Sequence, residues 1–121
     1  GAGNMRITSL WLNADPSQDF EAGNITLSSS DYDMLLFIFR LQTSGATEYS
    51  TICLKGSNTI VTTIYGGGSV HITALTRLAS YTDATHYAVG GCIKYEEGST
   101  GVASNGNMIP YKVLGIKIMS N

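Results

Sequence analysis

The sequence predicts an all-β protein, an antiparallel β-sandwich of seven to eight strands with a jelly-roll-like arrangement. Thr, Ser, Ile, Tyr and Gly dominate the composition, whereas good helix formers are scarce. Short apolar segments recur at roughly even spacing between clusters of turn residues, as in sandwiches and barrels. A length of 121 residues is enough for one domain with one core. We therefore expect a single sandwich domain over residues 5–121, preceded by a linker or cloning remnant over residues 1–4.

The first half of the chain supplies four expected strands, at residues 6–13, 24–28, 32–42 and 49–56. Pro16 lies in the polar segment that ends the first strand. The segment 32–42, YDMLLFIFRLQ, is apolar on both faces, which is typical of a central strand covered on two sides. The segment 49–56 alternates as a strand, with Ile52 and Leu54 on one face.

Three further segments are expected to be strands before the last loop. Residues 58–65 lead to a glycine triplet, Gly66–Gly68, which permits a turn or bulge with positive φ. The segment 69–80, SVHITALTRLAS, alternates as a strand but also has leucines at helical spacing, and its β-branched residues favour the strand. The segment 85–97 contains Gly90–Gly91, which indicates a bulge or a close backbone approach.

The chain finishes on a strongly apolar segment, NMIPYKVLGIKI, which follows the polar loop Gly98–Asn107. Since unpaired termini fray, a terminal strand this apolar is expected to be paired and buried, so that it closes the sandwich. The apolar residues change face along this strand, which predicts a bulge or kink near Gly115. Strand alternation predicts that the core includes Leu36, Ile38, Ile52, Val89, Ile93, Val113 and Ile116.

Composition and charge exclude several classes of function. Charged residues make up 13 % of the chain, against about 25 % in an average domain, so the surface must be built largely from Ser, Thr, Asn, Gly and Tyr. The net charge of −2 offers no basic face for nucleic acid and no polybasic membrane patch. The longest apolar run, Met34–Phe39, is far shorter than the ~18 residues of a spanning helix, and the N-terminal residues lack the pattern of a signal peptide. We expect neither nucleic-acid binding nor membrane insertion.

No group of residues matches a catalytic pattern, so we expect a protein that is not an enzyme and has no catalytic residues. Asp83 precedes His86 by three residues, but no Gly-x-Ser-x-Gly elbow supports a nucleophilic triad. Glu96 and Glu97 are adjacent, so on a strand they point to opposite faces and cannot flank one glycosidic bond.

The sequence also predicts no cofactor and no metal site. One alternative stays open, a calcium site formed by Asp15, Asp19 and Glu21, although their spacing is not that of an EF-hand loop. Cys53 and Cys92 are too few for a structural zinc site. These two residues could form a disulfide, or they could both be small buried hydrophobic side chains.

The candidate ligand site is the stretch SYTDATHY, Ser80–Tyr87. Tyr81 or Tyr87 could stack on a sugar ring, while Asp83 and His86 could form hydrogen bonds with its hydroxyl groups. The alternative is an ordinary hairpin turn in which these side chains serve the structure.

Two groups of residues match a pattern beyond strand periodicity. The first lies in LWLNADPSQDFEAGNITLSSSDYDMLLFIFR and comprises Leu10, Trp11, Asn13, Pro16, Phe20, Ala22, Ile25, Leu27, Tyr32, Asp33 and Arg40. The second lies in IPYKVLGIKI and comprises Ile109, Pro110, Lys112, Gly115, Ile116 and Lys117. The pattern resembles a small domain at or near the C-terminus of tail and baseplate proteins from phages of Gram-positive gut bacteria. The likeness spans most of Leu10–Ile118, with the middle matched only by strand spacing.

The resemblance implies a virion tail or extracellular location, a homotrimer, and other tail proteins as partners. Our leading interpretation is a non-enzymatic tail or baseplate domain that contributes to attachment to a host-surface glycan. One alternative is a purely structural module for trimerisation or capping. Another is a secreted bacterial carbohydrate-binding module attached to an enzyme.

Overall fold

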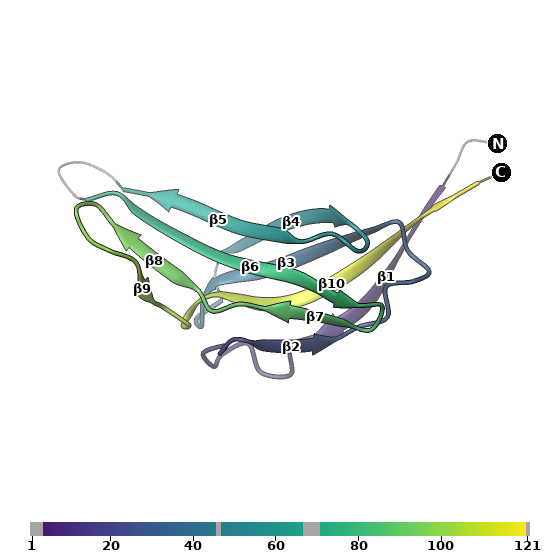
Figure 1. Cartoon of the computed structure of the whole chain (residues 1–121), viewed down its shortest axis with the longest axis horizontal. Helices are drawn as coiled ribbons and strands as arrows, with labels where there is room; N and C mark the ends of the chain where they lie inside the picture. The colour runs from purple at the N-terminus through teal and green to yellow at the C-terminus, as the bar shows by residue number, and fades with distance from the viewer. Residues whose placement is uncertain (1–3, 46, 67–70, 121) are drawn as a thin grey trace.

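The computed structural model describes residues 4–45, 47–66 and 71–120, and these residues form strands and connections without a helix. Two antiparallel sheets pack face to face (Figure 1). The β-sandwich expected from the sequence is confirmed, with ten strands in the described residues in place of seven to eight. The strands are β1 (Asn4–Leu12), β2 (Gly23–Thr26), β3 (Met34–Gln42), β4 (Glu48–Leu54), β5 (Thr59–Tyr65), β6 (Thr73–Asp83), β7 (His86–Val89), β8 (Ile93–Glu96), β9 (Val102–Ala103) and β10 (Asn107–Met119).

The larger strand count has a local cause. The segment expected to be one strand over residues 85–97 is divided into β7 and β8, which pair with different parts of β6. Gly90 and Gly91 lie at the interruption, where a bulge or a close approach within one strand was expected. The close approach is present at Gly91, because a Cβ there would lie 3.1 Å from Oδ1 of Asn105. The loop after β8 also contains the two-residue strand β9, which pairs with β8.

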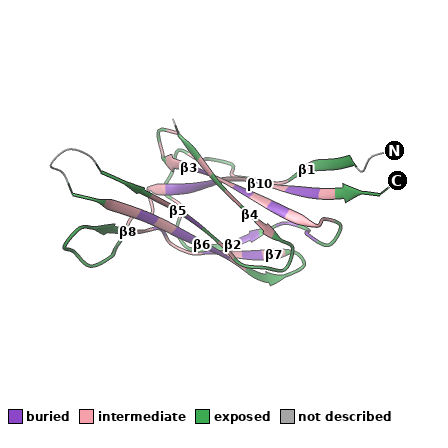
Figure 2. Ribbon diagram, turned by 90° about the horizontal axis from the view of Figure 1, so that it is seen from above, coloured by how far each residue is buried: buried purple, intermediate pink, exposed green. Residues whose placement is uncertain are grey.

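The chain passes repeatedly between a four-stranded and a six-stranded sheet. The first sheet has the order β1-β10-β3-β4, and the second has the order β2-β7-β6-β8-β9 with β5 on β6. The hairpins β3–β4 and β5–β6 each stay within one sheet, whereas β1 to β2, β2 to β3, β4 to β5 and β9 to β10 cross between sheets. Figure 2 shows that most buried segments lie along the strands. Much of the chain in the connections is exposed, although Leu27, Ser29 and Cys92 lie in connections and are buried.

The apolar C-terminal strand is paired on both sides, since β10 lies between β1 and β3. Its inward side chains, such as Val113, are buried. The register shift in β10 falls between Pro110 and Lys112, so the expected kink near Gly115 is displaced. Gly115 serves a close approach instead, because a Cβ there would lie 2.7 Å from the ring of Tyr32.

The register predicted for β3 is wrong. Leu35, Phe37 and Phe39 face the six-stranded sheet and are buried, whereas Leu36 and Ile38 lie on the other side and are half-buried. Because both faces of β3 are apolar, alternation alone could not decide which face points inward. The two large phenylalanine rings fill the space between the sheets.

The prediction of which face is buried is also wrong for β4, which pairs with β3. Ile52 pairs directly with Leu36 and is exposed rather than buried. Ile93 is half-buried because it pairs with Thr76 on the outside of the six-stranded sheet. Val89 and Val113 are buried in the core between the sheets, as expected. Ile116 is also buried, but it lies on the other side of β10, paired with Met34 and Ile7.

One inward position of β6 is occupied by a charged side chain, Arg77, which is only 1 % exposed. The residues at the neighbouring inward positions, Leu75 and Ala79, are apolar and buried. One terminal nitrogen of Arg77 donates hydrogen bonds to the carbonyl oxygens of Phe20 (2.9 Å) and Gly90 (2.8 Å). The guanidinium thereby joins the β1–β2 connection to the interruption between β7 and β8.

The second terminal nitrogen of Arg77 reaches the connection between β9 and β10 and the start of β10. It donates to the carbonyl oxygens of Asn107 (2.9 Å) and Asn105 (3.3 Å). The side chain of Asn105 extends the network, since it donates to the carboxylate of Glu21 (2.8 Å) and accepts from the amide of Cys92 (3.0 Å). Three connections that are distant in sequence are therefore held together around one cation.

Burial lowers the pKa of Arg77, because removal from water disfavours the charged form. The Coulombic effects of Cys92, Glu21 and Asp19 act in the opposite direction. An arginine side chain nevertheless stays protonated in proteins. The hydrogen bonds to the carbonyl groups must therefore compensate for the lost hydration of a full charge.

Replacing Arg77 with Met should lower the free energy of unfolding by at least about 3 kcal/mol, because buried carbonyl groups would lose their donors. Arg77→Lys should give a smaller loss, since an ammonium keeps the charge but lacks the planar fork. Urea denaturation measures both effects, with Arg6→Met in exposed β1 as the control. A loss below about 1 kcal/mol for Arg77→Met would contradict this role.

Candidate functional site

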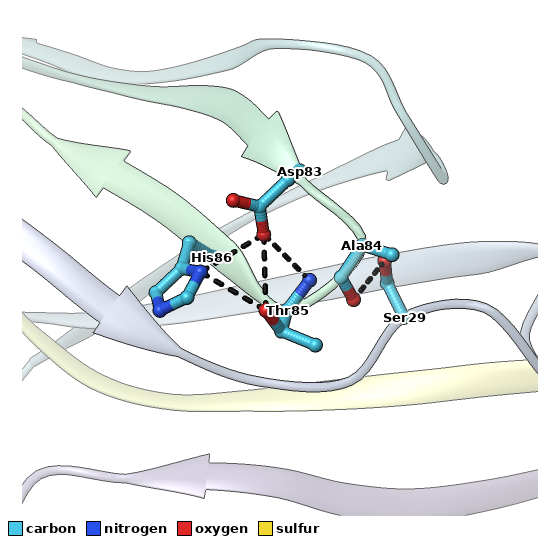
Figure 3. A network of polar contacts seen from close by, with 5 residues as sticks. All are labelled: Ser29, Asp83, Ala84, Thr85 and His86. Atoms are coloured by element: carbon cyan, nitrogen blue, oxygen red, sulfur yellow. Dashed lines mark hydrogen bonds and ion pairs between the residues drawn. The ribbon is translucent and has the colours of Figure 1, made fainter.

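The candidate ligand stretch forms the hairpin between β6 and β7, and its polar side chains are organised around Asp83 (Figure 3). Oδ1 of Asp83 accepts hydrogen bonds from the amide of Thr85 (2.9 Å) and from its hydroxyl group (3.0 Å). The same oxygen lies 2.9 Å from Nδ1 of His86. An aspartate side chain that accepts a hydrogen bond from the backbone amide two residues later commonly stabilises a tight turn.

These contacts bring Asp83 and His86 together, as the sequence predicted, but they also occupy the groups that a ligand would use. The backbone hydrogen bond from Thr85 and, after it, the hydrogen bond from His86 lower the pKa of the Asp83 carboxyl. These three contacts of the carboxylate all use Oδ1. Asp83 therefore serves first to shape the hairpin.

Tyr87 cannot stack on a ligand, because its side chain is 0 % exposed. Its ring packs edge-on against Phe37, with 5.2 Å between centroids, and its hydroxyl donates to the carbonyl oxygen of Ser57 (3.1 Å). Burial raises the pKa of Tyr87 to about 12, because the phenolate would lose its hydration, and the nearby Cys53 adds to the effect. Strand alternation along β7 places Tyr87 and Val89 inward, so the expectation that Tyr87 could stack on a sugar is wrong.

Tyr81 keeps the exposure that a stacking residue needs. It is 39 % exposed and pairs directly with Tyr87 across the hairpin, with ring centroids 5.7 Å apart. The backbone amide of Tyr81 donates to Oδ1 of Asn58 (2.8 Å), which ties the strand to the β4–β5 turn. Of the two tyrosines in the predicted site, Tyr81 is the one whose ring a ligand can reach.

Beside Tyr81 lies a depression of about 290 Å³. Three connections contribute its walls: β2–β3, β4–β5 and β6–β7. The lining residues are Ser29, Ser30, Lys55, Gly56, Tyr81 and Ala84. An aromatic ring, an ammonium group and serine residues around one hollow give both an apolar contact and hydrogen-bond donors.

The connections around the depression are fixed by hydrogen bonds. Nζ of Lys55 donates to the carbonyl oxygen of Ser30 (2.7 Å), which links β4–β5 to β2–β3. The amide of Ser29 donates to the carbonyl oxygen of Ala84 (3.0 Å), which links β2–β3 to the β6–β7 hairpin. Gly56 adopts a φ of 80°, which a residue with a side chain would adopt only under strain. The hollow is thus built from parts that keep their relative positions.

Sequence reasoning did not find Lys55, Ser29 or Ser30. All three lie in connections far from Tyr81 in the sequence. Lys55, the nearest of them, precedes Tyr81 by 26 positions. No local spacing indicates that these turns meet. The turn signal around Gly56 was visible, but its neighbours in space were not.

The remaining expectations about sites concern metals and cysteines. The described residues contain no group of three His, Cys, Asp or Glu side chains arranged to hold a metal ion, so the calcium alternative is not supported. Glu21 instead accepts a hydrogen bond from Asn105, and Asp15 accepts one from the amide of Ser17. Cys53 and Cys92 are both free thiols. Among residues 4–45, 47–66 and 71–120, no helix is long and apolar enough to cross a membrane.

Comparison of the chain with protein-family models, with curated proteins and with solved structures gave no match. A functional proposal therefore rests on the geometry of the site and on the sequence resemblance.

The lowered pKa of Asp83 can be observed directly. In an NMR titration, the amide proton of Thr85 should shift with a midpoint below 3.8, the ordinary value of the carboxyl group. A carboxylate whose pKa is lowered by folding stabilises the fold above its unfolded pKa, and this contribution is lost as the pH falls through the folded pKa. The shift should vanish in Asp83→Asn. A midpoint at or above 3.8 would show that the hairpin does not hold the carboxylate in this way.

The two tyrosines should differ in their effect on stability. Tyr87→Ala should lower the free energy of unfolding by about 3–5 kcal/mol, as for other buried aromatic residues. Tyr87→Phe should cost about 1 kcal/mol, since it removes only the hydrogen bond to Ser57. Tyr81→Ala should cost about 1 kcal/mol or less. Equal losses for the two alanine variants, measured by urea denaturation, would mean that Tyr81 is structural.

Proposed function

We propose that this chain is a non-enzymatic recognition module that binds a surface glycan through the depression beside Tyr81. The setting that the sequence resemblance supports is a phage tail or baseplate, where such a module contributes to host attachment. The observation that carries the proposal is the combination of an exposed tyrosine ring with Lys55 and two serine residues around one small hollow.

The chemistry of the hollow fits a sugar better than a charged or a fully apolar ligand. The ring of Tyr81 offers an apolar surface for the C–H face of a sugar and keeps a hydroxyl group for a hydrogen bond. The hydroxyl of Ser30 and the ammonium of Lys55 can bond to sugar hydroxyl groups. A volume of about 290 Å³ lies at the lower limit of ligand pockets, which suits a short oligosaccharide end.

Rigidity of the site favours binding. The turn around Asp83 and the hydrogen bonds of Lys55, Ser29 and Tyr81 fix the walls before a ligand arrives. A preorganised site avoids the free-energy cost of ordering loops on binding. A single site of this size would bind weakly, and display of several copies on one particle would raise the overall affinity.

A second candidate function is a purely structural assembly module. It is favoured by the outward side of the four-stranded sheet, where Ile52, Leu54 and Ile7 are exposed. A carbohydrate-binding module attached to an enzyme makes the same prediction about glycans as the leading proposal, and the genes beside this one would separate these two.

A glycan array followed by calorimetry tests the proposal. The start of β1 and the end of β10 lie toward the end of the sandwich that holds the β6–β7 hairpin (Figure 1), so the protein should not be immobilised through either strand end when binding is measured. Tyr81→Ala and Lys55→Ala should each weaken binding of the best glycan by about tenfold or more. Asp83→Ala is a poorer test, because it also removes the hydrogen bond from the Thr85 amide that stabilises the turn.

Tyr95→Ala is the matched control, because Tyr95 is also exposed but lies in β8, outside the depression. Its affinity should equal that of the unchanged chain. The glycan proposal fails if no glycan binds, or if the Tyr81 and Lys55 variants bind as well as the control. In either case the structural module becomes the better interpretation.

A further inference from the structure

The four-stranded sheet has a second apolar face, on the side away from the six-stranded sheet. Strand register fixes which residues share it. One row of directly paired residues crosses all four strands: Ile7, Ile116, Met34 and Leu54. The next row on the same side crosses them again: Ser9, Leu114, Leu36 and Ile52.

Two flanking rows complete this surface, which we call the outer face. On one side of the central rows, Met5 of β1 pairs with Ile118 of β10. On the other side, Lys112 pairs with Leu12 and with Ile38, and Ser50 pairs with Ile38. Within these four rows Lys112 is the one ionisable side chain, and it lies at the margin.

The outer face is open to solvent over much of its area. Leu54 is 65 % exposed, Ile7 58 % and Ile52 52 %, and Met5, Leu12 and Ile118 are exposed as well. Scattered apolar residues are normal on a protein surface, but a continuous apolar area across a whole sheet is rare on a monomer. This arrangement indicates that another molecule covers the face.

The outer side of the six-stranded sheet is different. Exposed apolar residues occur there too, including Ile60 and Ile64 of β5. Between them lies Thr62, whose hydroxyl is hydrogen-bonded to that of Thr76 on the neighbouring strand (3.1 Å). The apolar residues on that side are therefore interrupted by a polar row, whereas those of the outer face are contiguous.

We propose that the outer face is a self-association surface, covered in solution by the same face of a second copy of the chain. The exposed and half-buried apolar side chains on it offer on the order of 800 Å² of accessible surface, which is what each partner buries in a stable interface of standard size. This proposal does not depend on the glycan site.

Geometry and charge select a second copy as the occupant. A twisted sheet face is best covered by another sheet face with its strands roughly aligned, and two identical faces have the same twist and width. A two-fold arrangement needs only self-complementarity, and a face without opposed charges supplies it. Lys112 is the one charged side chain within the four rows, and the paired Arg40 and Glu48 lie one row beyond them, so a partner recognised through its charges would find few groups to pair with on the outer face.

Light scattering during size exclusion, from about 1 to 100 µM, tests the proposal across the range in which weak oligomers dissociate. The unchanged chain should form a closed dimer. The double variant Ile52→Lys, Leu54→Lys should weaken association about 100-fold, because each interface would contain two added ammonium groups from each copy. Both residues are already exposed in a single copy, so the variant should keep its fold, which circular dichroism checks.

The matched control is Ile60→Lys, Ile64→Lys on β5. Its residues are of the same kind and similarly exposed, at 53 % and 68 %, but they lie on the other sheet. The control should associate as the unchanged chain does. A closed trimer that the β4 variant dissociates would overturn the same-face pairing, because a three-fold interface joins two different surfaces of the chain. A monomer at 100 µM, aggregates without fixed size, or equal effects of the two double variants would overturn the proposal.

Discussion

The guanidinium of Arg77 and the carbonyl groups around it determine how one end of this sandwich is built. A cation at an inward position of β6 would be costly unless its donors found acceptors. Three connections supply carbonyl acceptors to the two terminal nitrogens, while the buried Nε has no partner among the described residues. These hydrogen bonds fix where β10 begins, because Asn107 is one of the acceptors. From there β10 runs between β1 and β3, so the Arg77 network lies at the start of the central pairing of the four-stranded sheet.

Much of the fold could be predicted because its signals are local. Gly90 and Gly91 mark the interruption between β7 and β8, and the apolar C-terminal segment is indeed a paired strand. The register of β3 could not be predicted, because both of its faces are apolar and the choice depends on which strands cover it. Arg77 was missed for a similar reason, since its acceptors are carbonyl groups that carry no sequence signal.

The candidate site was predictable only in part. The residues of one hairpin can be read from the sequence, and Asp83 and His86 do meet there. Their role in fixing the turn, and the burial of Tyr87, depend on the direction of each side chain relative to the second sheet. The depression beside Tyr81 needs Lys55 and Ser30 as well, and only the folded chain brings these three connections together.

Two surfaces with separate roles emerge from this architecture: a small polar-aromatic hollow at one end, and an apolar outer face on the four-stranded sheet. The hollow is lined by residues at three turns and the end of β6, whereas the outer face follows the strands of the four-stranded sheet, and the two surfaces adjoin where Lys55 follows Leu54. A crystal structure of the assembled protein with a bound oligosaccharide tests this account most directly. We predict that the outer face contacts another copy while the sugar ring lies against Tyr81. An outer face left open to solvent, with the sugar bound elsewhere, would contradict it.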